Sequence, residues 1–174
     1  LYSSAASDVY KRQAYLGHKW CNYWFHVHHL NTNSGKMSKS KGEFLTVSLL
    51  ESKGYDPVIY RFFCLLSHYR KSLVFSYENL DNAKGAYEKL VAKIAQLLKA
   101  EQGKIDKAAY DKLREGFTAA MDNDINTSLA ITALYDVLKA DTTPATKLAL
   151  IADFDKVLSL SLIEKAKSVN EKPA

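Results

Sequence analysis

Residues 76–98 read SYENLDNAKGAYEKLVAKIAQLL, and apolar side chains return in this stretch every three or four positions. That spacing puts them on one face of an α-helix, and Ser76, just before the run, is a residue type that favours a helix N-cap. The stretch therefore predicts a long amphipathic helix that begins after Ser76. Its inward-facing residues are expected to be Leu80, Ala83, Tyr87, Leu90, Ile94 and Leu97.

Three more amphipathic helices are predicted after this one. The second follows a break near Gly103, the third has Asn126 or Thr127 available as its cap, and the fourth opens at Thr143-Pro144. Four such helices with short connections predict a mainly α fold, an antiparallel helical bundle over residues 76–174 with a frayed polar end at 168–174. The expected inward residues are Tyr110, Leu113, Phe117 and Ala120, then Ala130, Leu134, Val137 and Leu138, then Ile151, Phe154 and Leu158.

Shorter elements are predicted upstream of the bundle, in a segment of connecting helices at 46–75. Asp56 followed by Pro57 is a typical helix start, so a helix should run from 57 to about 67. A short helix is expected at 46–53, ending at Gly54, and residues 29–32 are interpreted as extended. The inner face of the 57–67 helix would carry Phe62, Phe63 and Leu66. Farther upstream, helical spacing predicts a packed helix with Trp20, Tyr23, Trp24 and Val27 on one face.

The first thirteen residues, LYSSAASDVYKRQ, have no apolar period. Residues 3–13 resemble the translation of a transposon-type sequencing adapter, so we interpret residues 1–13 as a non-native, disordered read-through. A genuine disordered terminus is the alternative. On either interpretation the natural chain is expected to start near Ala14, inside a longer protein, so that the sequence represents a fragment.

Charge is concentrated in one part of the chain. The formal net charge is +5, and residues 36–71 hold seven basic groups against Glu43, Glu51 and Asp56. A local basic patch suits a polyanion such as nucleotide phosphate or RNA. No apolar run approaches the roughly 20 residues of a membrane span, no signal-peptide pattern opens the chain, and Cys21 and Cys64 lack metal-type spacing. These features predict a cytoplasmic protein with reduced cysteines.

Residues 35–42 read GKMSKSKG and place three lysines on a loop between glycines. A lysine beside the phosphates of ATP can neutralise the charge that grows on departing pyrophosphate, which accelerates the step if the contact tightens as the bond breaks. A loop that opens and closes would admit ATP and release product. Ser38 and Ser40 add hydroxyl donors.

The pentapeptide KMSKS at residues 36–40 is the second signature of class I aminoacyl-tRNA synthetases. Its surroundings resemble cysteinyl-tRNA synthetases in particular, over about residues 15–162. The resembling motifs are NYWFH at 22–26, SHYR at 67–70 with Leu73, Phe75 and Ser76, and the acidic turn MDNDINT at 121–127.

The resemblance implies a cysteine–tRNA ligase of protein biosynthesis, which forms cysteinyl-adenylate from ATP and transfers the cysteinyl group to tRNA. Residues 14–45 would end a Rossmann-like catalytic domain, the helical remainder would bind tRNA, and residues 56–61 would resemble the DALR-type helix. Lys39 and Lys36 would be the catalytic groups and Met37, Ser38 and Ser40 the rest of the ATP contact. The implied partners are ATP, L-cysteine and tRNA(Cys), with no membrane and a monomeric enzyme. The chain alone is expected to be inactive.

Two departures from the family pattern follow the signature directly. Lys41 stands where an apolar residue is common, and Glu43 stands where asparagine is frequent. Both are expected to tune the loop rather than to remove its contact with ATP.

No metal site is predicted in these residues. The resemblance implies zinc in the parent enzyme, but the HIGH signature and the zinc-binding residues are absent here. His26 and His29 could face one way on a helix without a carboxylate or thiol nearby in sequence. Residues 122–126 begin like a calcium loop, yet Thr127 and Ala133 replace its glycine and closing glutamate, and helix capping explains them better.

Alternatives remain open for the roles of some residues and for the function of the whole protein. Arg70 and Lys71 could meet tRNA phosphates, or could simply favour the dipole at a helix end. The aromatic residues near Trp20 and Trp24 are expected to be core rather than stacking platforms for bases. For the whole protein, the alternatives are a cysteine ligase of thiol biosynthesis that shares the fold, and a non-catalytic helical RNA-binding module.

Overall fold

The computed structural model describes residues 2–32, 35–36 and 45–171. The described residues form eight helices and a three-stranded sheet. The helices are α1 (Tyr2–Leu16), α2 (Val47–Ser52), α3 (Pro57–Leu65), α4 (Tyr77–Lys99), α5 (Lys107–Asp122), α6 (Thr127–Lys139), α7 (Pro144–Leu158) and α8 (Leu162–Glu171), and the strands are β1 (Leu30–Thr32), β2 (Gly35–Lys36) and β3 (Leu73–Phe75).

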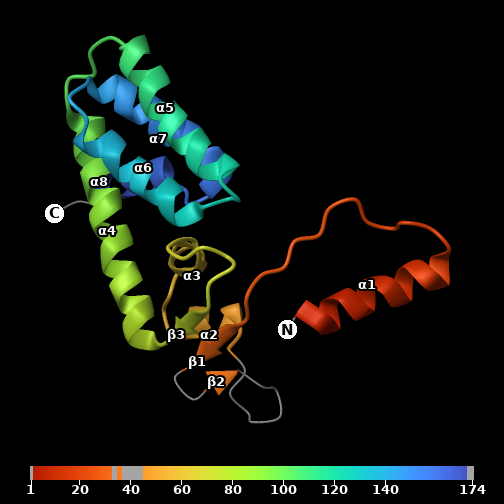
Figure 1. The fold of residues 1–174 in the computed structure, drawn as a ribbon. Coiled ribbons are helices and arrows are strands. Elements are labelled where there is room, and N and C mark those ends of the chain that lie inside the picture. Colours follow the sequence, from red (N-terminus) through yellow and green to blue (C-terminus); the bar gives the residue numbers. More distant parts are fainter. Residues whose placement is uncertain (1, 33–34, 37–44, 172–174) are drawn as a thin grey trace.

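The mainly α bundle predicted from the sequence is confirmed, and α4 is its longest member. Figure 1 shows α4 along one side of the molecule, with α5, α6 and α7 gathered beside its C-terminal half and α3 beside its N-terminal half. The repeating apolar residues of α4 point inward, and Leu80, Leu90 and Ile94 have no exposed surface. Across the bundle the rings of Phe117 and Phe154 stack with their centroids 4.0 Å apart.

The predicted caps at Ser76 and Asn126 are confirmed, whereas the cap of α5, Asp106, was not predicted. Ser76 accepts a hydrogen bond from the amide of Asn79 at 3.0 Å, and Asp106 accepts one from Ala109 at 3.1 Å. Of the two candidates for the third cap, Asn126 takes the role through the amide of Leu129, at 3.2 Å. Each cap satisfies a backbone donor that the first helical turn leaves without a partner.

One helix, α8, was not predicted. It packs on α4, where the Asn170 side chain donates to the carbonyl of Ala95 at 3.0 Å. Residues 168–171, expected to be frayed, belong to this helix. The connection from α7 to α8 is a tight elbow in which Ser159 and Ser161 adopt left-handed backbone angles. The Asp155 carboxylate holds the elbow by accepting from the amides of Leu160 and Leu162, at 2.6 and 2.8 Å.

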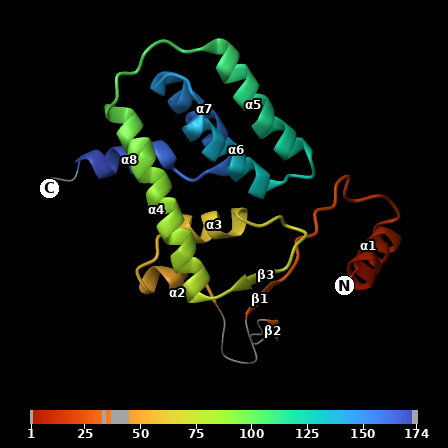
Figure 2. The same ribbon diagram turned by 60° about the vertical axis from the view of Figure 1, so that its left-hand side comes forward.

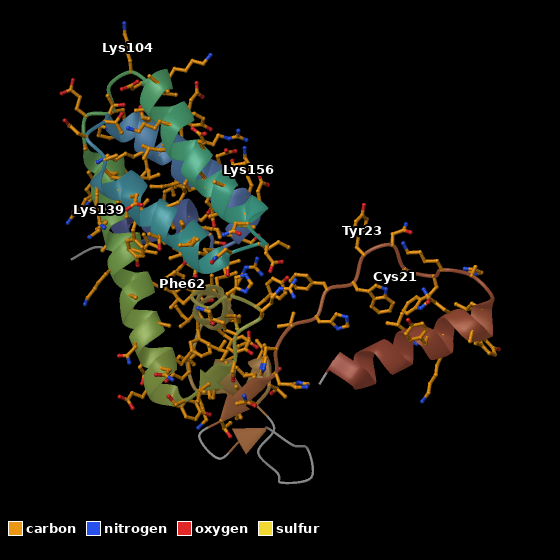
Figure 3. The ribbon with its side chains drawn as sticks, in the orientation of Figure 1. Cys21, Tyr23, Phe62, Lys104, Lys139 and Lys156 are labelled. Atoms are coloured by element: carbon orange, nitrogen blue, oxygen red, sulfur yellow. The ribbon has the colours of Figure 1, made fainter. Side chains whose placement is uncertain are left out.

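Helix α3 docks against both α4 and the α7–α8 elbow. Asp56 caps it and Pro57 occupies its first turn, as predicted. Phe62 (labelled in Figure 3) is fully buried and meets the ring of Tyr87 edge-on, with the centroids 5.6 Å apart. Arg61 Nε donates to the carbonyl of Leu158 at 2.6 Å. Leu66 is not part of the inner face, because it follows the end of the helix and is 40% exposed.

The small sheet lies at the end of α4 away from α5, α6 and α7 (Figure 2). Its strand order is β2-β1-β3, with β1 antiparallel to β2 and parallel to β3. Leu30 pairs with Leu73, and Thr32 pairs with Phe75. Because Ser76 follows β3 directly, the strand connects to the start of α4.

The N-terminal segment differs from the prediction. Residues 18–29 form no helix, Tyr23 is 91% exposed and points away from the body (Figure 3), and Trp24 and Val27 are also exposed. The reason is a tertiary contact that overrides the local spacing: the amide of His28 donates to the carbonyl of Tyr69 at 2.8 Å. Where disorder was expected, the structure has helix α1, which lies apart from the bundle in Figures 1 and 2.

None of the described helices combines the length and apolar character that crossing a lipid bilayer requires.

A buried hydroxyl is one of the groups that bind the loop between α4 and α5 to the start of α7. Thr146, in the first turn of α7, has no exposed surface, and its Oγ1 accepts from the amide of Asp106 at 2.8 Å. The same Oγ1 lies 2.8 Å from that of Thr143. Gly103 in this loop has φ +68, and a Cβ there would lie 3.1 Å from the Thr143 methyl group. The loop can therefore approach α7 closely only with glycine at this position.

We predict that Thr146→Val destabilises the protein by about 1–3 kcal/mol, because the amide of Asp106 loses its acceptor while the side-chain volume is kept. Thr146→Ser is the matched control, since it keeps the hydroxyl and removes only a methyl group. Urea unfolding followed by circular dichroism measures both variants. A valine variant at least as stable as the serine variant would contradict this account.

Candidate functional site

The structure describes only the base of the lysine loop. Lys36 is the last residue of β2, and its backbone pairs with Asn31 of β1. Met37, Ser38, Lys39 and Ser40 lie outside the described residues, as do Lys41 and Glu43. The chain is described again from Leu45, which packs against the core just before Thr46 caps α2. The loop thus leaves the sheet at its edge strand and returns to the core next to α2.

Strand β1, which pairs with β2 at the base of the loop, is hydrogen-bonded to the segment before α4. β1 is the central strand of the sheet, and the side chain of Asn31 donates to Ser72 Oγ at 2.7 Å. Residues 67–75 therefore determine where the base of the lysine loop sits relative to the bundle.

Two motifs that the sequence marks separately meet in space. Arg70 from the SHYR stretch donates through Nε to Oδ2 of Asp124 at 2.6 Å and through Nη2 to Oδ1 at 3.3 Å. The hydroxyl of Tyr69 donates to Oδ1 of the same carboxylate at 2.5 Å, and His68 Nε2 lies 3.7 Å from Oδ2. We call these four residues, His68, Tyr69, Arg70 and Asp124, the Asp124 cluster. Sequence reasoning singled out both stretches but did not pair them.

In the Asp124 cluster a positive guanidinium faces a negative carboxylate, and both side chains are about half exposed. The hydrogen bond from Arg70, followed by that from Tyr69, lowers the pKa of Asp124 below its usual value. The same carboxylate raises the pKa of the Tyr69 hydroxyl. Because water reaches about half of the Arg70 and Asp124 side chains, this pairing contributes geometry more than stability.

The backbone of the α5–α6 turn directs Asp124 toward the cluster. Asp124 and Ile125 both have positive φ, 57° and 53°, a region that a β-branched residue such as isoleucine rarely enters. The amide of Ile125 donates to the carbonyl of Met121 at 2.9 Å, and the amide of Asn126 donates to Ala120 at 3.0 Å. The acidic turn is therefore a helix-to-helix connection that ends in the Asn126 cap.

A pocket of about 330 Å³ lies beside the Asp124 cluster. Its walls come from the segment before β1, from α3, from residues 67–73 and from the α5–α6 turn, including Phe25, Val27, Tyr60, Cys64, Ile125 and Thr127. Burial raises the pKa of the Tyr60 hydroxyl to about 12 and also raises the pKa of the Cys64 thiol. Tyr60 and Cys64 are thus both neutral at neutral pH, and the basic residue Lys71 also lines the pocket.

The predicted tRNA contacts differ in their surroundings. The guanidinium of Arg70 is held by Asp124, whereas the neighbouring Lys71 is exposed at the rim of the pocket. In the described ranges, no three His, Cys, Asp or Glu residues come together as a group that could hold a metal ion. These residues do not fit a zinc site, and we assign no step to zinc in this part of the chain.

We predict that Asp124→Asn lowers stability at pH 6 and that the difference from the unchanged protein disappears as the pH falls toward 2. The folded-state pKa of Asp124 is lowered, so its contribution is present above the unfolded value of about 3.9 and is lost as the folded group is protonated. Unfolding in urea across this pH range measures the effect. Asp122→Asn, two residues earlier, is the control and should not lose stability at pH 6. A constant difference at all pH values would argue against the ionic pairing.

Two family models match the chain. The model described as "tRNA synthetases class I (C) catalytic domain" matches residues 6–85, and the model described as "DALR domain" matches residues 116–160. The first match includes the segment 46–75 and the start of α4. The second lies in α5, α6 and α7, so the earlier assignment of a DALR-type helix to residues 56–61 is wrong. Tyr69 and Arg70 fall in the first match and Asp124 falls in the second.

Three of the similar curated proteins carry the name cysteine–tRNA ligase. The chain is 42% identical over 150 residues to "Cysteine--tRNA ligase" of Novosphingobium aromaticivorans, covering 81% of this chain and 29% of the relative. It is 34% identical over 160 residues to "Cysteine--tRNA ligase 1" of Burkholderia lata, covering 91% and 33%. It is 32% identical over 175 residues to the protein of the same name in Borreliella burgdorferi, covering 91% and 36%.

The chain spans about a third of the length of these relatives. The two family models follow each other in the order expected from the resemblance, and the relatives match through most of the chain. On these findings the chain belongs to the cysteine–tRNA ligase family of class I aminoacyl-tRNA synthetases.

Proposed function

We propose that the chain supplies the phosphate-binding lysine loop and the helical tRNA-binding part of a cysteine–tRNA ligase. That enzyme would join cysteine to ATP, release pyrophosphate and pass the cysteinyl group to tRNA(Cys). The observation that carries the proposal is the position of the KMSKS stretch, which begins where the β1–β2 hairpin leaves the sheet at Lys36. The catalytic-domain match extends across this stretch.

In this proposal, Lys39 and Lys36 act on the phosphates of ATP. Their ammonium groups would neutralise the negative charge that develops on pyrophosphate as its bond to the α-phosphate breaks. The acceleration comes from contacts that are stronger in the transition state than in bound ATP. Ser38 and Ser40 would donate to phosphate oxygens, and Met37 would complete the loop. For residues 37–40 the support is the sequence and the family match, because they lie outside the described residues.

The helical part would hold tRNA by its phosphates. Figure 3 shows Lys104, Lys139 and Lys156 pointing outward from different places on the bundle, and Lys71 is exposed near the sheet. Lysines on a surface contact a nucleic acid backbone without reading its sequence. Zinc and the choice of cysteine would belong to the part of the ligase that this chain does not contain. We further propose a monomeric cytoplasmic enzyme.

The catalytic proposal is tested with Lys39→Ala in a full-length ligase that contains this chain. We expect cysteine-dependent exchange of pyrophosphate into ATP to slow by about one to three decades, the size of a lost transition-state donor. Lys41→Ala is the matched control, because that lysine lies just outside the KMSKS signature. An exchange rate unchanged by Lys39→Ala would refute the role of the loop. Charging of an amino sugar in place of tRNA would favour the thiol-biosynthesis alternative.

The tRNA proposal is tested by the salt dependence of binding. If Lys71 contacts a phosphate, Lys71→Ala should reduce the slope of log affinity against log salt concentration by about 1. Fluorescence anisotropy with labelled tRNA(Cys) measures the slope. Lys71→Arg, which keeps the positive charge, is the matched control and should leave the slope unchanged. A slope that stays the same in the Lys71 variant would remove this residue from the interface.

A further inference from the structure

Tyr69 belongs to the Asp124 cluster and also contacts the segment that leads into the sheet. Its hydroxyl donates to Asp124 in the α5–α6 turn at 2.5 Å. Its carbonyl accepts from the amide of His28 at 2.8 Å, and its ring stacks on Phe25 with the centroids 4.2 Å apart. A single side chain and its backbone thus connect the bundle to residues 25–28.

Those residues lead directly into the base of the lysine loop. β1 begins at Leu30, two positions after His28, and pairs with β2, which ends at Lys36. A second route runs in parallel. Arg70 contacts Asp124, Ser72 accepts from the side chain of Asn31, and β3 pairs with β1 from Leu73 onward. Both routes from Asp124 end on β1.

The turn that carries Asp124 has a strained backbone, as is typical of segments that position functional residues. Two consecutive residues other than glycine, Asp124 and Ile125, have left-handed backbone angles, which persist only where the surroundings hold them. Asp124 is held by the cluster, and Ile125 lines the pocket that Phe25 and His68 also line. The strained turn therefore contacts residues 68–70 through Asp124, and through Ile125 it lines the same pocket as the segment before β1.

We propose that Asp124 is a positioning residue that, through Tyr69 and Arg70, sets the β1–β2 hairpin, and with it the lysine loop, in register with the helical bundle. This inference rests on the proposed role of the loop in binding ATP. It adds that Asp124, in the region that matches the DALR domain, governs the position of the lysine loop in the region that matches the catalytic domain. Because the pairing is half-exposed, its loss should loosen the junction without unfolding the core.

The structural half is tested by hydrogen exchange on the chain itself. Asp124→Ala should speed exchange at the amide of His28 and at β1 by about tenfold, while the amides in the middle of α4 and α7 keep their protection. Tyr69→Phe, which removes only the hydroxyl, should act in the same direction. Asp153→Ala is the control, because it breaks another partly exposed arginine–aspartate pair, Arg114 Nε to Asp153 Oδ2 at 2.9 Å, between α5 and α7. Unchanged exchange at His28, or an equal rise throughout the core, would overturn the inference.

The functional half uses pyrophosphate exchange in a full-length ligase that contains this chain. Asp124→Ala should lower kcat and leave the KM for cysteine unchanged, and it should have no further effect when Lys39→Ala is already present. If both single variants are slow and their effects multiply, Asp124 does not act through the loop and the inference fails. If Lys39→Ala alone has no effect, the proposed function fails, and the exchange at His28 still decides whether Asp124 positions the hairpin.

Discussion

The fold depends on covering the apolar face of α4 along its whole length. One half of this face packs against α3, where Phe62 meets Tyr87, and the other half packs against α7 and α8. Tyr87 sits at the join, because its buried hydroxyl donates to the carbonyl of Leu160 in the elbow before α8. Burial of such side chains is the main favourable term in folding. Since the catalytic-domain match ends at residue 85, inside α4, this one helix makes the two matched parts share a core.

The features that could be predicted from the sequence are those that depend on residues close together in the chain. Caps such as Ser76 and Asp56 and the inward stripe of α4 were found because a helix start and a helical face are local properties. Strand β3 and helix α8 were missed because short elements are stabilised mainly by distant partners, here β1 and α4. The helix expected around Trp24 is absent, and the segment instead contacts a distant partner, Tyr69, through His28 and Phe25.

The candidate site was predictable as a set of motifs and not as an arrangement. KMSKS, SHYR and the acidic turn can each be read from the chain, and the two family matches span these stretches. The contact between Arg70 and Asp124, 54 positions later, depends on how α5 packs. A single sequence contains no signal that predicts it. The only local hint is the polar MDNDINT stretch itself, whose asparagine and aspartate residues tolerate left-handed angles.

The hydrogen bond from Arg61 to the carbonyl of Leu158 has a consequence for folding during synthesis on the ribosome. Ninety-seven positions separate the two residues, so the ribosome releases α3 long before its docking partner exists. Until the α7–α8 elbow emerges, the buried face of α3 has no complete covering and is open to chaperones or to wrong partners. Contacts of such long sequence separation also form slowly. The junction between the two parts of the chain therefore closes only once the α7–α8 elbow has been synthesised.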